Sequence, residues 1–543
     1  MANVKQEPWA ILLCRFSDDP NDPSQTRVMD LAAQWRAKGD QNFIMANLNP
    51  SWDADNRTIL ALYEVFFTIT GIFTFNVVQY FDAMSHGLVD VTGNKVFPCK
   101  LNLTAAEGLA LANNPGGKEY QDGMFKRAKD ALLQQYGINW KDFYGIAVSF
   151  QSPDFGSQGG VNYDGGPGVY MDIRYVVNNG TQRWGHEMGH GFGLGHSRTD
   201  GVLTSNCTGG DPSDYTDPWD IMSVECAFSA ADNDYGMRGP GMNAWNMRHM
   251  QGLDESRIWK GSNNTDFSET IVLNPLHWRY KAGFLGAEIP GIGPNSAYLV
   301  EFRTREFWDA AIPQPQVIVH RFEDVHSYIM KGTKGQKSLS AGDVFQSGSG
   351  PFSRVQVLSI DAANNTATVR LCYSLEPIVT PSVKINFEKP VDPCVPDEPV
   401  AGSEAKFVFE LSNVICNMSY QVLWSVSGTS PLSGQLNTGS SFSIWTPDPP
   451  IAVTVSVTIF FDDGTIITDA YPFHSIDQAT AGAIHFFCEN SRKHKLRVIP
   501  WWEWDLEKLR TIANDYSREE LKLIEQRTEK ILQTVRQLNK VVR

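Results

Sequence analysis

A short segment of the chain holds residue types that can bind one metal ion. HEMGHGFGLGH, from His186 to His196, contains three imidazoles and one carboxylate. His186 and His190 are four residues apart, so on a helix they lie on one face, one turn apart. Neutral imidazole is a preferred zinc ligand, and catalytic zinc sites use three protein ligands and keep one position open. The spacing therefore predicts a zinc site formed by His186, His190 and His196.

Two further residues of the segment suit a catalytic site. Glu187 follows the first ligand, where its carboxylate can reach a metal-bound water and act as a general base. Gly193 can take the left-handed conformation that ends a helix, and this turn would bring His196 back to the other imidazoles. The alternative is chance, because a bare HExxH motif is short and a lone buried histidine is usually only a satisfied polar group. The match at all five positions favours the zinc site.

The motif and the downstream segment YTDPWDIMS resemble the metzincin metallopeptidases. Their signature is HExxHxxGxxH followed by a methionine turn, and Met222 stands in the methionine position. The resemblance implies that Met222 forms an apolar floor under the zinc ligands, whereas the simpler interpretation is an ordinary core methionine. The chain departs from some metzincins at Val224, where those have a tyrosine. No tyrosine is therefore assigned to the site.

More of the chain resembles the gametolysin and immune inhibitor A-like secreted peptidases, namely Trp9–Pro23, Val77–Val96 and the segment GPGMNAWNMRHMQGLDESRI. The immune inhibitor group often has Asp as third ligand, so His196 favours the gametolysin side. The resemblance implies a zinc endopeptidase in which Glu187 activates a zinc-bound water to hydrolyse protein or glycoprotein substrates. The alternative function is an adhesive or glycoprotein-binding protein that keeps a metzincin scaffold with little or no proteolysis. Retention of the general base Glu187 favours the enzyme.

Composition and length limit the remaining possibilities. The chain has 543 residues and a formal net charge of −15, with no basic stripe, which argues against a nucleic-acid partner. No apolar run is long enough to predict a transmembrane segment. The first residues, MANVKQEPW, have the pattern of neither a signal peptide nor a pro-segment. The resemblance nevertheless implies a secreted protein, and we expect an extracellular location.

The pattern of elements predicts a multi-domain chain. Residues 1–262 alternate strands and helices, typical of an α/β (α+β) metzincin-like catalytic domain, and Val169–Trp184 predicts one or two short strands and a loop before the motif helix. Residues 263–376 show short alternating strands and predict an antiparallel β-sandwich. Residues 377–475 predict an immunoglobulin-like β-sandwich. Residues 476–543 form a Trp-rich segment and a C-terminal amphipathic helix, whose nearly heptad spacing suggests self-association, although packing on its own domain is favoured.

Two weaker features concern disulfides and a second metal. Cys207 and Cys226 bracket the methionine turn and could form a disulfide, although connectivity cannot be deduced from spacing. The loop QSPDFGSQGGVNYDGGPG contains Asp154 and Asp164, a composition that could bind calcium through oxygen ligands. No twelve-residue calcium-binding pattern is present, so a flexible loop is the favoured interpretation.

Overall fold

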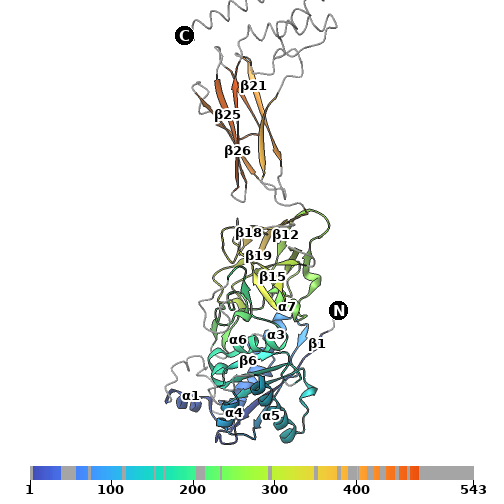
Figure 1. The fold of residues 1–543 in the computed structure, drawn as a ribbon, viewed down its shortest axis with the longest axis vertical. Coiled ribbons are helices and arrows are strands. Elements are labelled where there is room, and N and C mark those ends of the chain that lie inside the picture. Colours follow the sequence, from blue (N-terminus) through green and yellow to red (C-terminus); the bar gives the residue numbers. More distant parts are fainter. Residues whose placement is uncertain are drawn as a thin grey trace, which may run out of the picture. The chain divides into compact units, whose positions relative to one another are not determined.

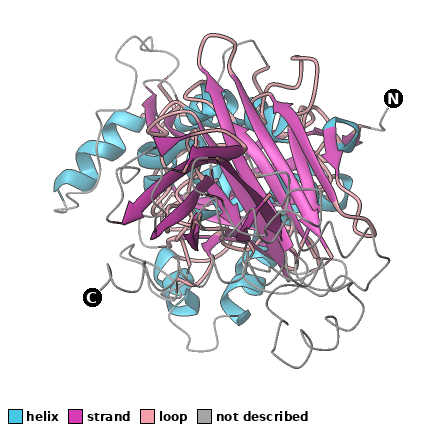
Figure 2. Cartoon of the chain, turned by 90° about the horizontal axis from the view of Figure 1, so that it is seen from above, coloured by secondary structure: helices cyan, strands magenta, loops and turns pink. Residues whose placement is uncertain are grey.

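The chain divides into two compact units, Met1–Ile378 and Val379–Arg543. Among the described helices, none has the length and hydropathy needed to cross a membrane. The fold is rich in strands (magenta in Figure 2), which form several sheets, with fewer helices. The computed structural model describes residues 4–37, 57–70, 75–112, 118–151, 155–163, 165–202, 214–232, 235–291, 296–347, 352–375, 381–388, 400, 403–412, 420–428, 436–446, 452–461 and 465–475.

The N-terminal part of the first unit is built on a five-stranded sheet. Its strands, in spatial order, are β4 (Lys95–Lys100), β2 (Trp9–Arg15), β5 (Gly145–Phe150), β7 (Gly168–Asp172) and β6 (Ser157–Gly160). The first four strands are parallel, and only β6 at the edge is antiparallel to its neighbour. Alternate residues of β2 enter two different cores, with Trp9 in one and Ala10 in the other. Burial on both faces explains the continuous apolar run of this strand.

Helices cover both faces of this sheet. The helices are α1 (Val28–Ala37), α2 (Ile59–Phe67), α3 (Val77–Met84), α4 (Ala105–Ala112), α5 (Lys118–Tyr136) and α6 (Ile173–Gly191). Helices α2, α3 and α6 contribute to the core that contains Trp9, whereas α5 contributes to the core that contains Ala10. Accordingly, α3 and α6 lie on the opposite side of the sheet from α4 and α5 (Figure 1). Helix α5 ends at Tyr136, and Gly137 follows its end at φ +67°.

Helix α6 begins earlier than the sequence suggested. The prediction of a loop within Val169–Trp184 was wrong, because α6 follows β7 directly. The side chain of Asp172 caps the new helix by accepting a hydrogen bond from the backbone N–H of Arg174 at 3.1 Å. Gly180 then interrupts the helix with φ +49° and ψ −132°, packed against the backbone of Tyr235. The kink re-aims the second half of α6, which carries the predicted metal ligands.

Strand β6 packs closely on that second half. A methyl group added to Gly159 would lie 2.0 Å from the carbonyl oxygen of Glu187 and 3.0 Å from Cβ of His190. Only a residue without a side chain therefore allows β6 to run along this turn of α6.

Replacing Gly159 with Ala is expected to lower the free energy of unfolding by about 1–3 kcal/mol, because the backbone of α6 cannot yield to the new methyl group. Gly123 in α5 is the matched control, since a methyl group there meets nothing within 4 Å. Gly123→Ala should be neutral or stabilise the protein by up to about 1 kcal/mol through helix propensity. Urea denaturation measures both. Equal stability of the two variants would contradict the close packing of β6 on α6.

Two sheets make up the rest of the first unit. One has the order β11 (Ile258–Lys260), β13 (Gly286–Pro290), β14 (Ala297–Arg303), β15 (Gln316–Glu323), β16 (His326–Ile329) and β8 (Arg198–Thr199). The other has the order β12 (Phe267–Leu273), β19 (Thr366–Ser374), β18 (Phe352–Asp361) and β17 (Val344–Gln346). Both sheets contribute side chains to one apolar core. Short elements precede these sheets: β1 (Lys5–Gln6), β3 (Val89–Asp90), β9 (Ala230–Asp232), β10 (Gly236–Arg238) and α7 (Ala244–His249).

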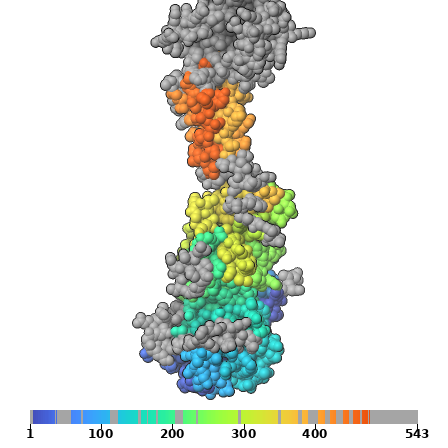
Figure 3. Space-filling view, in the orientation of Figure 1, coloured from blue at the N-terminus to red at the C-terminus, as the bar shows by residue number. Residues whose placement is uncertain are grey.

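The larger sheet joins residues 1–262 to residues 263–376. Strands β11 and β8 come from the first segment and pair in parallel with β13 and β16 of the second. In the space-filling view, the blue-to-teal and green-to-yellow residues of this unit form a continuous surface (Figure 3). The two segments therefore form one body, in which the strand-rich part supports the loop after α6.

The described residues of the second unit form two antiparallel sheets around one core. Its strands β25 and β26 are consecutive in the chain and pair antiparallel. The Trp-rich segment and the C-terminal helix of residues 476–543, with the predicted self-association, lie outside the described residues. One sheet contains β20 (Ser382–Phe387), β21 (Glu404–Ser412) and β24 (Ser441–Trp445), and the other contains β23 (Leu436–Asn437), β22 (Tyr420–Gly428), β25 (Ala452–Phe461) and β26 (Ile466–His474).

Candidate metal centre

The structure brings the three motif histidines together. His186 and His190 lie one turn apart on α6, with their Nε2 atoms 3.1 Å from each other. One ring nitrogen from each of His186, His190 and His196 falls within 4.8 Å of the others, and no other cluster of potential metal ligands occurs in the described part of the chain. Three imidazole nitrogens at this spacing can surround one metal ion.

A helix-ending turn places the third histidine. Gly193 takes φ +91° after the last residue of α6. The backbone N–H of Leu194 donates to the carbonyl of Gly189 at 3.0 Å, and the N–H of Gly193 donates to the carbonyl of His190 at 2.9 Å. These two bonds define a Schellman motif, which favours glycine at the left-handed position. The chain reverses here and returns His196 to the helix.

Hydrogen bonds fix the tautomer of each histidine. Nδ1 of His186 lies 3.0 Å from the carbonyl oxygen of Ile221, and Nδ1 of His190 lies 2.7 Å from that of Leu194. A carbonyl only accepts, so each Nδ1 carries the proton and each Nε2 keeps its lone pair. Two lone pairs 3.1 Å apart repel each other unless a cation lies between them. This donor set therefore fits a metal ion.

Burial keeps two of these imidazoles neutral. Burial, and next the neighbouring His190, holds the pKa of His186 well below its ordinary value. Burial and His190 also lower the pKa of His196 to about 4, although Asp214 opposes this shift. Metal ions bind the unprotonated imidazole, so both side chains are ready to bind a metal near neutral pH.

Asp214 orients the third histidine. Its Oδ2 accepts a hydrogen bond from Nδ1 of His196 at 2.7 Å, and its Oδ1 accepts one from Nη2 of Arg198, also at 2.7 Å. A carboxylate behind a ligating histidine fixes the tautomer and raises the basicity of the ligand. The sequence motif gave no sign of this residue, which lies in the loop before the methionine turn.

Replacing Asp214 with Asn is expected to weaken zinc binding by about 10–100-fold, because the amide orients His196 less firmly and adds no negative charge. Competition with a chromophoric chelator measures the affinity. Asp142→Asn is the control, since Asp142 is an exposed aspartate outside the site. Equal zinc affinity of the two variants would show that Asp214 plays no part in orienting the ligand.

The candidate general base is buried beside the histidines. Glu187 is 3% exposed and lies 3.7 Å from the guanidinium of Arg183, which also pairs with Glu225 at 2.6 Å. Burial raises the pKa of Glu187, while Arg183 acts in the opposite direction. A raised pKa brings a carboxylate closer to the range in which it can accept and then return a proton.

The methionine turn packs under α6. Met222 is fully buried, and a methyl group added to Gly189 would lie 2.6 Å from its Sδ. Asp220 holds the turn by accepting hydrogen bonds from the N–H of Met222 at 2.7 Å and from the hydroxyl of Ser197 at 2.8 Å. Met222 thus contacts the helix turn between the first two histidines, the location expected of an apolar floor.

Tyr215 is a residue of the site that the sequence did not predict. Its hydroxyl lies 2.9 Å from Nε2 of His196, and its ring centroid lies 4.3 Å from that of the same imidazole. It has φ +54°, an uncommon conformation for a bulky residue, which is often found at functional sites. Val224, the position of the tyrosine in some metzincins, is a buried apolar residue here. The only sequence signal for Tyr215 was its position in the loop that precedes Met222.

Several residues of the predicted disulfide and calcium loop lie outside the part of the chain that the structure describes. They include Cys207 and both aspartates of the suggested calcium loop, Asp154 and Asp164. Cys226 is disulfide-bonded, so the pairing with Cys207 stays a prediction. Cys372 is also disulfide-bonded, whereas the buried Cys14 and Cys99 are free.

Comparisons with known proteins add little to this description. No protein-family profile matches the chain, and no curated protein matches it. Among solved structures, the chain is similar to wild-type OgpA from Akkermansia muciniphila, with 8% sequence identity, 87% of this chain and 94% of that chain covered, and a TM-score of 0.23. A likeness this low supports no conclusion about fold or function. The function is therefore inferred from the geometry of the site.

Proposed function

We propose that this chain is a secreted zinc endopeptidase with a metzincin-like catalytic domain. One observation carries the proposal: three imidazole nitrogens converge, and hydrogen bonds hold the proton on each Nδ1, so that each Nε2 has a lone pair to offer a metal ion. Glu187, the candidate base, stands next to the first of these ligands on the same helix. A structural zinc site is normally closed by four protein ligands, whereas three leave a position for water.

His186, His190 and His196 would hold the zinc. When bound, zinc polarises the scissile carbonyl and lowers the pKa of a coordinated water towards neutrality. Glu187 takes a proton from the attacking water and passes it to the leaving amine. The hydroxyl of Tyr215 lies 2.9 Å from Nε2 of His196, the nitrogen that would bind the metal. From this position it would donate a hydrogen bond to the oxyanion that develops on the substrate.

The edge strand β6 supports a peptide as substrate. One edge of β6 pairs with β7, and within the described residues no strand pairs with its other edge. Because Gly159 touches the turn of α6 that carries Glu187 and His190, an extended chain added to β6 would lie beside the histidines. Backbone hydrogen bonds to an exposed sheet edge are a common mode of peptide binding.

The test combines metal analysis with cleavage mapping. The full chain, loaded with one equivalent of zinc, is incubated with a peptide library derived from a whole proteome. We expect cleavage that a chelator abolishes and that added zinc restores. Cleavage that persists without metal, or a fully loaded protein that cuts no peptide, would refute the proposed function.

The second candidate function is binding without hydrolysis. The observation that favours it is the strand-rich second unit, since two-sheet modules of this kind often bind or space other domains. Loss of the general base would be expected of an inactive scaffold, but Glu187 is present and buried beside the ligands. The enzyme is therefore the better-supported function.

A further inference from the structure

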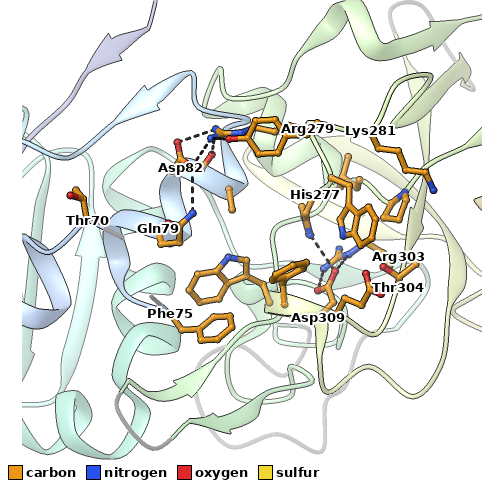
Figure 4. Close-up of a pocket in the computed structure, with 18 residues that line it drawn as sticks. Thr70, Phe75, Gln79, Asp82, His277, Arg279, Lys281, Arg303, Thr304 and Asp309 are labelled. Carbon is orange, nitrogen blue, oxygen red and sulfur yellow. Dashed lines mark hydrogen bonds and ion pairs between the residues drawn. The ribbon is translucent and has the colours of Figure 1, made fainter. Parts of the chain in front are cut away.

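A large cavity lies in the first unit, away from the histidine cluster. It has a volume of about 890 Å³ and forms between α3 and two loops of the strand-rich part, residues 275–281 and 303–309. Figure 4 shows Phe75 and Gln79 on one side and Arg303 and Asp309 on the other. The volume falls in the range of small-molecule sites. No residue of the candidate metal centre lines it, so the proposed hydrolysis does not explain this cavity.

Aromatic rings line the cavity in two pairs. Phe75 and Trp308 meet edge to face with ring centroids 5.2 Å apart, and Trp278 and Phe307 do so at 6.4 Å. Phe307 adopts φ +49°, a costly conformation for an aromatic residue, yet its side chain is 48% exposed. Because about half of Phe307 stays in contact with solvent, the free energy gained by burying its ring offsets only part of the cost of this backbone conformation. Strain of this kind is typical of residues that a ligand site holds in place.

One carboxylate oxygen of a residue that lines the cavity is buried without a hydrogen-bond partner. Oε1 of Glu306 accepts a hydrogen bond from Nδ2 of Asn365 at 3.1 Å, whereas its Oε2 is buried without any hydrogen bond. An unsatisfied buried oxygen is expensive, and native structures contain few of them. Because this oxygen is closed off from solvent, a hydroxyl donor in the cavity can reach it only after the side chain of Glu306 rotates toward the cavity that the residue lines.

The charges of the lining are balanced. The carboxylates of Asp82, Glu306 and Asp309 match the cations of Arg279, Lys281 and Arg303 in number. Arg279 pairs with Asp82 at 2.9 Å, and Arg303 pairs with Asp309 within the same cavity. Neither a cationic nor an anionic ligand would find an excess of opposite charge. The lining therefore favours a neutral ligand.

We propose that this cavity binds a neutral saccharide. A sugar ring presents an apolar C–H face that can lie on Trp278 or Phe307. Hydroxyl groups at its edge can donate to the carboxylate of Glu306 once that side chain has turned toward the cavity. The paired groups of Asp82 and Arg279 offer further acceptors and donors at the rim. An ammonium ligand would also suit aromatic rings and a carboxylate, but the balanced charge disfavours it.

The experiment measures binding to the full chain by saturation-transfer difference NMR and isothermal titration calorimetry. The probes are lactose, maltose, cellobiose and N,N′-diacetylchitobiose, with choline as the cationic arm and glucuronate as the anionic arm. We expect binding of at least one neutral disaccharide. Binding of none of the four, or binding of choline or glucuronate in their place, would overturn the proposal.

Two variants locate the bound sugar. Trp278→Ala removes a stacking surface, and Glu306→Gln replaces the unpaired acceptor by an amide that can keep the bond to Asn365. Each should weaken binding by about tenfold or more. Trp445→Ala is the control, because this exposed tryptophan belongs to the second unit. If the affinity for the sugar is unchanged in both cavity variants, the sugar binds elsewhere and the proposal is overturned. Intact peptide cleavage by each variant shows that its fold is retained.

Discussion

Glu187→Gln is expected to lower kcat/KM for peptide cleavage by about 10²–10⁴-fold while leaving zinc bound. Gln has nearly the same shape but cannot accept and return a proton, so the effect falls on the chemical step. The three imidazoles and their Nδ1 partners are unchanged, and the metal content should stay at one zinc per chain. Steady-state kinetics on a cleaved library peptide, with metal analysis of the same samples, provides the measurement.

Glu269→Gln serves as the matched control for this prediction. Glu269 is exposed on β12, and the same chemical change there should leave both kinetics and zinc content intact. If Glu187→Gln keeps full activity, Glu187 is not the general base. If the variant loses zinc as well, its role is to support the ligands, and the proposed mechanism is wrong.

Arg303→Met is expected to lower the free energy of unfolding of the first unit by about 3–5 kcal/mol. Arg303 is fully buried on β14 and pairs with Asp309 at 2.5 Å and with Glu301 at 3.1 Å. Despite burial, Arg303 and then His277 hold the pKa of Asp309 well below its ordinary value. The methionine variant would leave the two carboxylates buried without their cation.

Arg321→Met is the control for burial. Arg321 pairs with Asp200 and Glu323, but its side chain is 26% exposed, so water can solvate the partners that it leaves. Its replacement should cost about 1 kcal/mol or less. Urea denaturation followed by tryptophan fluorescence compares the two variants. Similar losses of unfolding free energy in the two variants would mean that the burial of Arg303 and its partner carboxylates does not increase the cost of removing the cation.

The histidine cluster could be predicted from sequence because its geometry is mostly local. A spacing of four residues fixes His186 and His190 on one helix face, and Gly193 marks the turn that returns His196. The alternation of strands and helices over residues 1–262 was equally clear, since strand burial and helix ends depend on neighbouring residues.

The remaining parts of the site depend on contacts that no local pattern encodes. Asp214 and Tyr215 reach His196 because their loop folds back over it, and nothing in their spacing shows this return. The early start of α6 was missed because Gly180, within an otherwise helical segment, kinks the helix without ending it. The zinc ion, the cleaved bond and the fold family stay predictions that the experiments above test.

The pairing of β16 with β8 ties the loop of the candidate metal centre to a strand that is made much later in synthesis. The N–H of Gly195 donates to the carbonyl of Val325 at 2.8 Å, and His326 bonds to the carbonyl of His196 across 130 residues of sequence. A nascent chain therefore presents all three histidines and Asp214 well before the residues that bond to the backbone on either side of the third histidine. A chain cut short before residues 325–329 would therefore carry the whole motif and Asp214, but would lack the contacts of Gly195 and His196 with Val325 and His326.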